Sequence, residues 1–115
     1  MHRQFAQQIA ALQHHLQEGD RASDLIQEAF PPLHQFFQHH IATAQAPETL
    51  GTGSNRFQAI QTEVHKQMRL LALDMMFLRT AHPGAKQALR LQQIEQRLNL
   101  LQTYCGAIAD VLPPP

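Results

Sequence analysis

Apolar residues recur in steps of three and four along most of the chain, which is the spacing of one face of an α-helix. No segment of useful length alternates apolar and polar residues as a half-buried strand does. Residues that interrupt helices are sparse, and they are Gly19, Pro31–Pro32, the segments 46–54 and 82–84, and the terminal prolines. The pattern therefore predicts an all-α protein.

The second half of the chain carries the clearest pattern. Between residues 85 and 112, steps of three and four alternate without an error through Leu91, Ile94, Leu98, Leu101, Cys105, Ile108 and Leu112. Over residues 54–80, one face is formed by Phe57, Ile60, Val64, Met68, Leu71, Met75 and Leu78. Such faces favour shallow, nearly antiparallel packing, and residues 82–84 supply a short turn. We expect a long antiparallel hairpin over about 54–80 and 85–112.

Two or three shorter helices are expected before this hairpin. The first has a face made of Phe5, Ile9, Leu12 and Leu16. It should end at Gly19, which suits a left-handed C-terminal cap. The second begins near Asp20 or Ser23 and should end or kink at Phe30, because a following proline disfavours the helical conformation. A third helix can then begin at Pro31–Pro32, since proline is favoured in a first turn.

The length of 115 residues predicts one domain, with N-terminal helices over 2–46, a loop over 47–53 and the hairpin over 54–112. A helix over 54–80 is about 39 Å long at 1.5 Å per residue. A globular chain of this length has a diameter of roughly 35 Å. We therefore expect an elongated bundle.

The helix over 54–80 carries a second apolar face. Leu70, Leu73 and Phe77 lie nearly opposite Leu71 and Met75 at about 100° per residue. The other hairpin helix covers only one of the two faces. The second face must be covered by the N-terminal helices or by another molecule. That molecule is either a second copy, which would make the protein a homodimer, or a partner protein.

Asp74 lies between the two apolar faces of this helix. A desolvated carboxylate needs a partner, and in a hairpin that turns at 82–84 the nearest cations are Arg90 and Arg97. We expect an ion pair that fixes the register of the hairpin. A contact of Asp74 with a partner protein is the alternative.

A third strip of the same helix combines polar and apolar groups. His65, Arg69 and Met76 share one side, because residues three, four or seven apart on a helix are neighbours, and Lys66 lies nearby. A cation, a titratable ring and a flexible apolar group are thus presented together. The strip is a candidate partner-binding surface, with an ordinary solvated strip as the alternative.

Composition and charge exclude several functions. Charged residues make up 16% of the chain and the net charge is +0, which gives no electrostatic basis for binding nucleic acid or an anionic membrane. The single cysteine, Cys105, allows no intramolecular disulfide and should be a small buried hydrophobe. The N-terminus lacks the pattern of a signal peptide, and no apolar run reaches the ~18 residues of a membrane span. We expect a cytoplasmic protein.

Eight histidines raise the possibility of a metal site. However, the chain contains neither Glu-x-x-His nor His-Glu-x-x-His, and the adjacent pairs His14–His15 and His39–His40 point to different sides of a helix. No nucleophile, base and orienting group can be assembled either. We predict no catalytic residue, no cofactor and no metal. The alternative is a ligand- or metal-binding bundle whose histidines surround a cavity together with Met68, Met75 and Met76.

Residues 56–81, RFQAIQTEVHKQMRLLALDMMFLRTA, and residues 97–112, RLNLLQTYCGAIADVL, resemble the cyanobacterial heterocyst frequency control proteins of the PatD family. The resemblance rests on Gln61–Glu63, Lys66, Gln67, Arg69–Leu71, Asp74, Met76–Leu78, Arg97, Leu98, Leu100, Leu101, Tyr104 and Cys105. It covers roughly half the chain. The first fifty residues are similar only in length and helical character.

The resemblance implies a non-enzymatic cytosolic regulator that associates with the division protein FtsZ and influences heterocyst frequency or cell division. The family has no catalytic residues to transfer to this chain. Because FtsZ proteins are generally acidic, Arg69 is the cation expected to orient docking.

Overall fold

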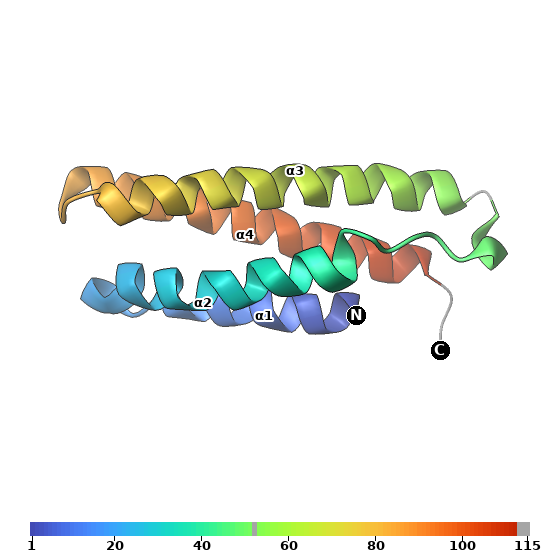
Figure 1. The fold of residues 1–115 in the computed structure, drawn as a ribbon, viewed down its shortest axis with the longest axis horizontal. Helices are drawn as coiled ribbons and strands as arrows, with labels where there is room; N and C mark the ends of the chain where they lie inside the picture. The colour runs from blue at the N-terminus through green and yellow to red at the C-terminus, as the bar shows by residue number, and fades with distance from the viewer. Residues whose placement is uncertain (52, 113–115) are drawn as a thin grey trace.

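Four α-helices, each antiparallel to the next, make up most of the protein in a computed structural model that describes residues 1–51 and 53–112. They are α1 (His2–His15), α2 (Ala22–Phe36), α3 (Gly53–Thr80) and α4 (Ala85–Val111) (Figure 1). A 3₁₀ turn over Gly19–Arg21 joins α1 to α2, and a π-helical segment over Phe37–Ile41 continues α2. Another 3₁₀ turn, Glu48–Leu50, lies in the connection to α3. The terminal prolines lie outside the described residues.

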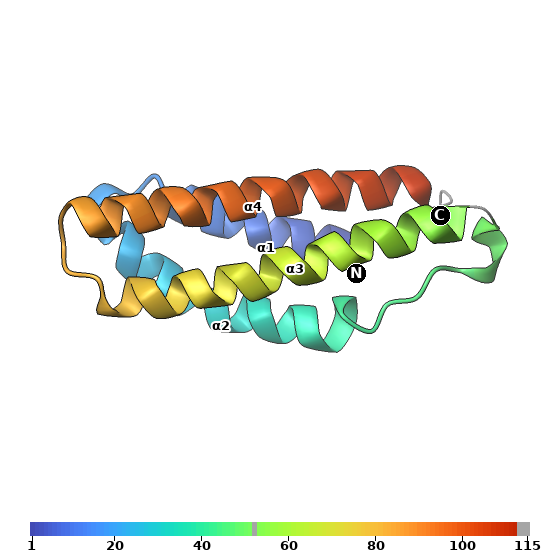
Figure 2. The same cartoon turned by 90° about the horizontal axis from the view of Figure 1, so that it is seen from above.

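The long hairpin is confirmed, with ends that differ from the expected 54–80 and 85–112 by no more than one residue. Gly84 makes the turn at its tip with a φ of 135°, which favours glycine. The structure is elongated as expected, with principal extents of 50 × 21 × 21 Å (Figure 2). Within the described residues, no helix is both long enough and apolar enough to cross a membrane.

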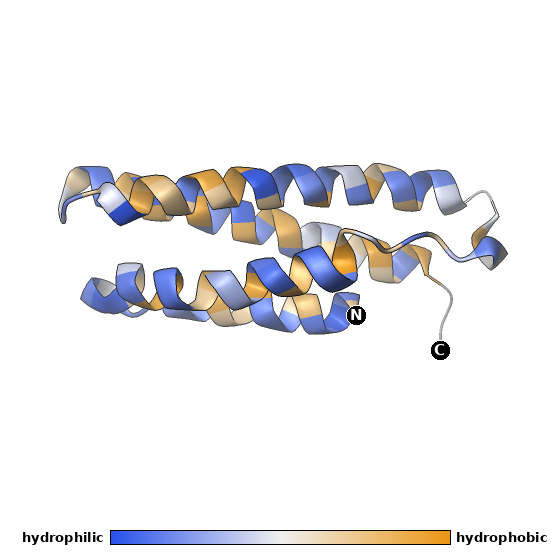
Figure 3. Cartoon of the chain, viewed as in Figure 1, coloured by the Kyte–Doolittle hydropathy of each residue, from blue (hydrophilic) through white to orange (hydrophobic). Residues whose placement is uncertain are grey.

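The core lies between the hairpin and a layer formed by α1 and α2. Helix α1 packs on α4 and α2, and α2 packs on α3. The core residues of the hairpin are Phe57, Val64, Met68, Leu71, Met75 and Leu78 of α3 and Ile94, Leu98, Leu101, Cys105 and Ile108 of α4. Each helix carries both hydrophobic and hydrophilic residues on its surface, as expected from apolar spacings of three and four (Figure 3).

The expected end of the helix at Phe30 is wrong, and so is the third helix starting at Pro31–Pro32. Helix α2 continues through both prolines to Phe36. Both prolines are exposed, so the carbonyl groups that they leave without an amide partner face the solvent side. An interior proline costs about 3 kcal/mol, so the two prolines together cost about 6 kcal/mol. Burial of Phe30 and Leu33, each worth about 1.5–3 kcal/mol, offsets much of that cost.

The end of α2 is attached to α3 by a buried hydrogen bond. The side-chain amide of Gln61 donates from Nε2 to the carbonyl oxygen of Ile41 over 2.9 Å. The same carbonyl also accepts from the backbone amide of Ala44 over 3.0 Å, so it receives two hydrogen bonds. The π-helical segment that continues α2 is thereby attached to the first third of α3.

Candidate functional site

The buried carboxylate of Asp74 connects the two long helices. Nη1 of Arg90 donates to Oδ1 over 2.9 Å, and Nε of Arg97 donates to Oδ2 over 3.1 Å. Asp74 is 4% exposed, whereas both arginines keep partial access to solvent. The sequence named Arg90 and Arg97 as alternatives, and the structure brings both to Asp74.

Arg90 also contacts an aromatic ring at the outer surface. Its guanidinium carbon lies 4.7 Å from the ring centroid of Phe77, a cation–π distance. Phe77, Arg90 and Asp74 therefore form a continuous contact from the surface to the helix–helix interface. Phe77 and Arg90 also lie at the same height along the bundle.

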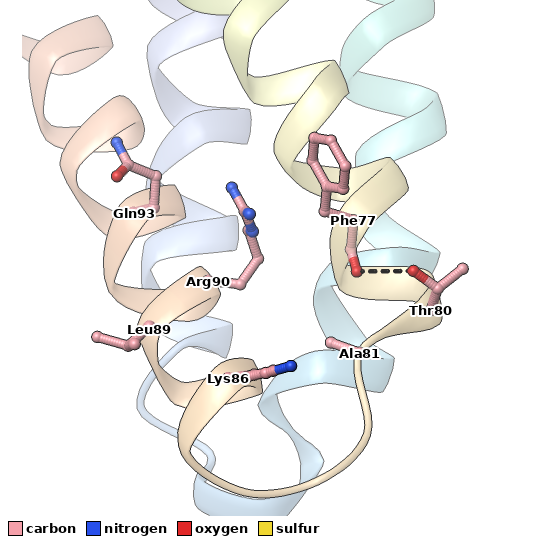
Figure 4. A pocket seen from close by; sticks show the side chains of 7 residues that line it. All are labelled: Phe77, Thr80, Ala81, Lys86, Leu89, Arg90 and Gln93. Carbon is pink, nitrogen blue, oxygen red and sulfur yellow. Dashed lines mark hydrogen bonds between the residues drawn. The ribbon is translucent and has the colours of Figure 1, made fainter.

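A groove of about 440 Å³ lies beside this contact near the tip of the hairpin. It is lined by Phe77, Thr80, Ala81, Lys86, Leu89, Arg90 and Gln93 (Figure 4). The groove offers an aromatic side chain and two cations, and Arg90 is already held by Asp74. It contains no catalytic constellation among its lining residues.

Apolar side chains lie exposed on the side of the hairpin away from α1 and α2. We call this the outer face. Its apolar members are Leu70, Leu73 and Phe77 of α3 with Leu89 and Leu100 of α4, and the polar Gln93 belongs to it as well. Leu73 is 44% exposed, Phe77 55%, Leu89 65% and Leu100 39%, while Leu70 is half-buried. Coverage of Leu70, Leu73 and Phe77 by the N-terminal helices is therefore wrong. Self-association through them remains a prediction.

The contribution of α4 to the outer face was not predicted from the sequence. Leu89 and Leu100 do not belong to the regular series of apolar positions that α4 packs against the core. The leucines outside that series were the only indication in the sequence that α4 contributes to the outer face. This indication was weaker than the three apolar residues of the second face of α3, because single exposed leucines are common on protein surfaces.

The candidate partner-binding strip of α3 is exposed. His65, Lys66 and Arg69 are accessible, and Met76 is 57% exposed. The ring of His65 packs edge-to-face on Phe37, with centroids 5.2 Å apart, which restricts its orientation. Helical spacing places His65, Arg69 and Met76 on one side and Lys66 toward the outer face.

In the part of the chain that the structure describes, the three methionines expected to surround a cavity together with histidines do not lie at one place. Met68 and Met75 belong to the core, whereas Met76 points outward. Among the described residues, no group of three histidine, cysteine, aspartate or glutamate side chains is arranged to hold a metal ion. His14, in the last turn of α1, and Glu18, just beyond the end of that helix, approach to 3.7 Å at the surface.

Cys105 lies in the core, on the face of α4 where the periodicity placed it. Burial raises the pKa of its thiol to about 11. The thiolate is the nucleophilic form, so this cysteine is kept in its unreactive state at neutral pH.

Comparisons with known proteins return no relative of this chain. No protein-family model, no curated protein sequence and no solved structure matches it.

Proposed function

We propose that the protein acts in the cytoplasm by binding another protein, without catalysing a reaction, and that its partner is FtsZ. The resemblance to the PatD family supplies the partner and the expected role in heterocyst frequency or cell division. The observation that carries the proposal is the exposed strip of α3 formed by His65, Arg69 and Met76.

The strip combines features that suit a protein contact. Met76 exposes more than half of its surface, and methionine side chains adapt to the shape of a partner. Arg69 is exposed and has no ion-pair partner among the residues that the structure describes. An arginine available in this way can pair with a carboxylate of an acidic partner and orient the encounter.

The test compares binding of purified FtsZ by the wild type, by Arg69→Glu with Met76→Ala, and by the matched charge reversal Arg21→Glu. Arg21 is also exposed but lies in the turn before α2. We expect the double variant to bind about tenfold more weakly or worse, and Arg21→Glu to bind like the wild type. Circular dichroism verifies that each variant is folded.

Two results would contradict the proposal at different levels. Undiminished binding by the folded double variant would move the binding site away from the strip. Failure of the wild type to bind polymerisation-competent FtsZ from the same organism would remove FtsZ as the partner. The structure gives less support to the alternative of a ligand- or metal-binding function, because two of the three methionines expected to line its cavity are core residues.

A further inference from the structure

We propose that the outer face is the interface of a two-fold symmetric homodimer, with α3 packed antiparallel on α3 of the second copy and α4 on its counterpart. This dimer does not depend on FtsZ or on the histidine-containing strip of α3. The proposal rests on exposed apolar surface, on its symmetric distribution and on the position of two opposite charges.

The outer face lies on the long side of a molecule that measures 50 Å by 21 Å. That side covers roughly 1,000 Å², and a standard interface buries about 800 Å² on each partner. A dimer of standard size would therefore bury most of this side, including the polar residues around the outer face. The four most exposed apolar side chains of the outer face belong to both helices, and they are Leu73 and Phe77 of α3 with Leu89 and Leu100 of α4. A second copy that covers both helices therefore buries all four.

Contacts across the hairpin define which residues lie at the same height. Asp74 reaches both Arg90 and Arg97, so it lies level with the midpoint between them. Phe77 lies level with Arg90, which it contacts. Both contacts give the same register between α3 and α4. Because the helices are antiparallel, residue numbers rise toward the tip of the hairpin along α3 and fall toward it along α4.

In this register the leucines of the outer face lie on both sides of one point along the length of the hairpin, which we call the midpoint. On α3 the midpoint lies between Leu70 and Leu73. On α4, Leu89 lies roughly 9 Å from it toward the tip and Leu100 roughly 7 Å from it toward the open end, at 1.5 Å per residue. A two-fold axis that crosses the helices at the midpoint therefore brings Leu89 of one copy to Leu100 of the other. The face is self-complementary, as an isologous interface requires.

The same axis brings two opposite charges together. Lys86 lies about 13 Å from the midpoint toward the tip, and Glu63 lies about 13 Å from it toward the open end. Helical spacing places both on the side of their helix next to the groove between α3 and α4. Neither has an ion-pair partner among the described residues. The dimer therefore contains Lys86 opposite Glu63 of the second copy, twice.

Lys66 lies toward the outer face, about 9 Å from the midpoint toward the open end, and the two-fold axis brings it level with Phe77 of the second copy and not with another cation. The two arginines nearer the midpoint do not oppose this arrangement either. Arg90 and Arg97 are held by Asp74, and Arg90 also lies against Phe77. Rim pairs contribute more to register than to affinity. The leucines should therefore supply most of the affinity, and Lys86 with Glu63 should select the antiparallel orientation.

Sedimentation equilibrium of the wild type, Leu73→Glu and the control Met76→Glu tests the location of the interface. Both substituted side chains are exposed on α3, so both variants should fold, which circular dichroism verifies. We expect a wild-type dimer at micromolar concentration, a dissociation constant raised about 100-fold or more by Leu73→Glu, and little change with Met76→Glu. A wild type that stays monomeric at high micromolar concentration overturns the proposal, and so does a dimer that Leu73→Glu leaves intact.

A charge exchange tests the orientation. Lys86→Glu and Glu63→Lys should each raise the dissociation constant about five- to tenfold, because each places like charges opposite one another. The double variant, Lys86→Glu with Glu63→Lys, should return to near the wild-type value. If the two effects add instead, these residues do not meet and the antiparallel arrangement is wrong.

Discussion

Arg97 and Asp74 lie on different long helices, and Nε of the arginine donates to Oδ2 of the carboxylate over 3.1 Å. The apolar positions of α3 and α4 repeat along each helix, so apolar packing alone tolerates a shift of one repeat between them. Such a shift would leave the buried carboxylate of Asp74 without its two arginines. The ion pair therefore specifies the register that apolar packing leaves open.

Replacement of Asp74 by alanine should lower the free energy of unfolding by about 1–3 kcal/mol, because two partly buried guanidinium groups lose their shared acceptor. Urea denaturation measures the change. Glu95→Ala, an exposed carboxylate on α4, is the control and should stay within about 0.5 kcal/mol of the wild type. A change within error for Asp74→Ala would show that the ion pair contributes no net stability to the fold.

Alanine at either proline of α2 should stabilise the protein. Pro31→Ala and Pro32→Ala each restore an amide donor to an exposed helix side, and this gain exceeds the lost restriction of the unfolded chain. We expect about 1–2 kcal/mol for each substitution by urea denaturation, with Pro83→Ala in the hairpin turn giving no gain. Loss of stability in the α2 variants would show that the prolines stabilise the protein more by restricting the unfolded chain than they destabilise the helix.

His2 should make stability depend on mildly acidic pH. Burial lowers its pKa from 6.5 and outweighs the hydrogen bond to Gln61, which raises the pKa. Below about pH 6.5 the unfolded chain therefore binds more protons at this site than the folded chain, so acidification favours unfolding.

Urea denaturation at about pH 7.5 and about pH 5.5 measures this dependence. His2→Gln should lose less stability between the two values than the wild type, whereas His82→Gln, at the exposed turn, should behave like the wild type. Equal losses in His2→Gln and the wild type would show that His2 titrates normally in the folded protein.

Alkylation of Cys105 should be slow in the folded protein. With a pKa near 11, its thiolate fraction at about pH 8 is roughly 100-fold below that of an ordinary cysteine. Iodoacetamide labelling followed by mass spectrometry should show rapid reaction only in guanidinium chloride. The control is Thr103→Cys with Cys105→Ala, which places the thiol at an exposed position of the same helix. Equally rapid labelling of both folded proteins would contradict the burial of Cys105.

Periodicity was sufficient to predict the helices of the hairpin and the choice of arginines for Asp74. Both follow from spacing along a single helix and from one short turn, so residues close in sequence contain the information. Periodicity also separated Leu71 and Met75 from the second apolar face of the same helix.

Packing between distant segments accounts for what the sequence did not predict. Proline rules describe local backbone preference, and α2 continues through Pro31 because the burial of Phe30 and Leu33 in a core built largely by other helices outweighs that preference. Likewise, periodicity shows that Leu73 and Phe77 lie on an apolar face but not whether α1 and α2 reach it. Those helices pack on the opposite side of the hairpin, so both side chains remain exposed. Their exposure depends on where non-local segments dock, and that is determined by the complete core and not by any single helix.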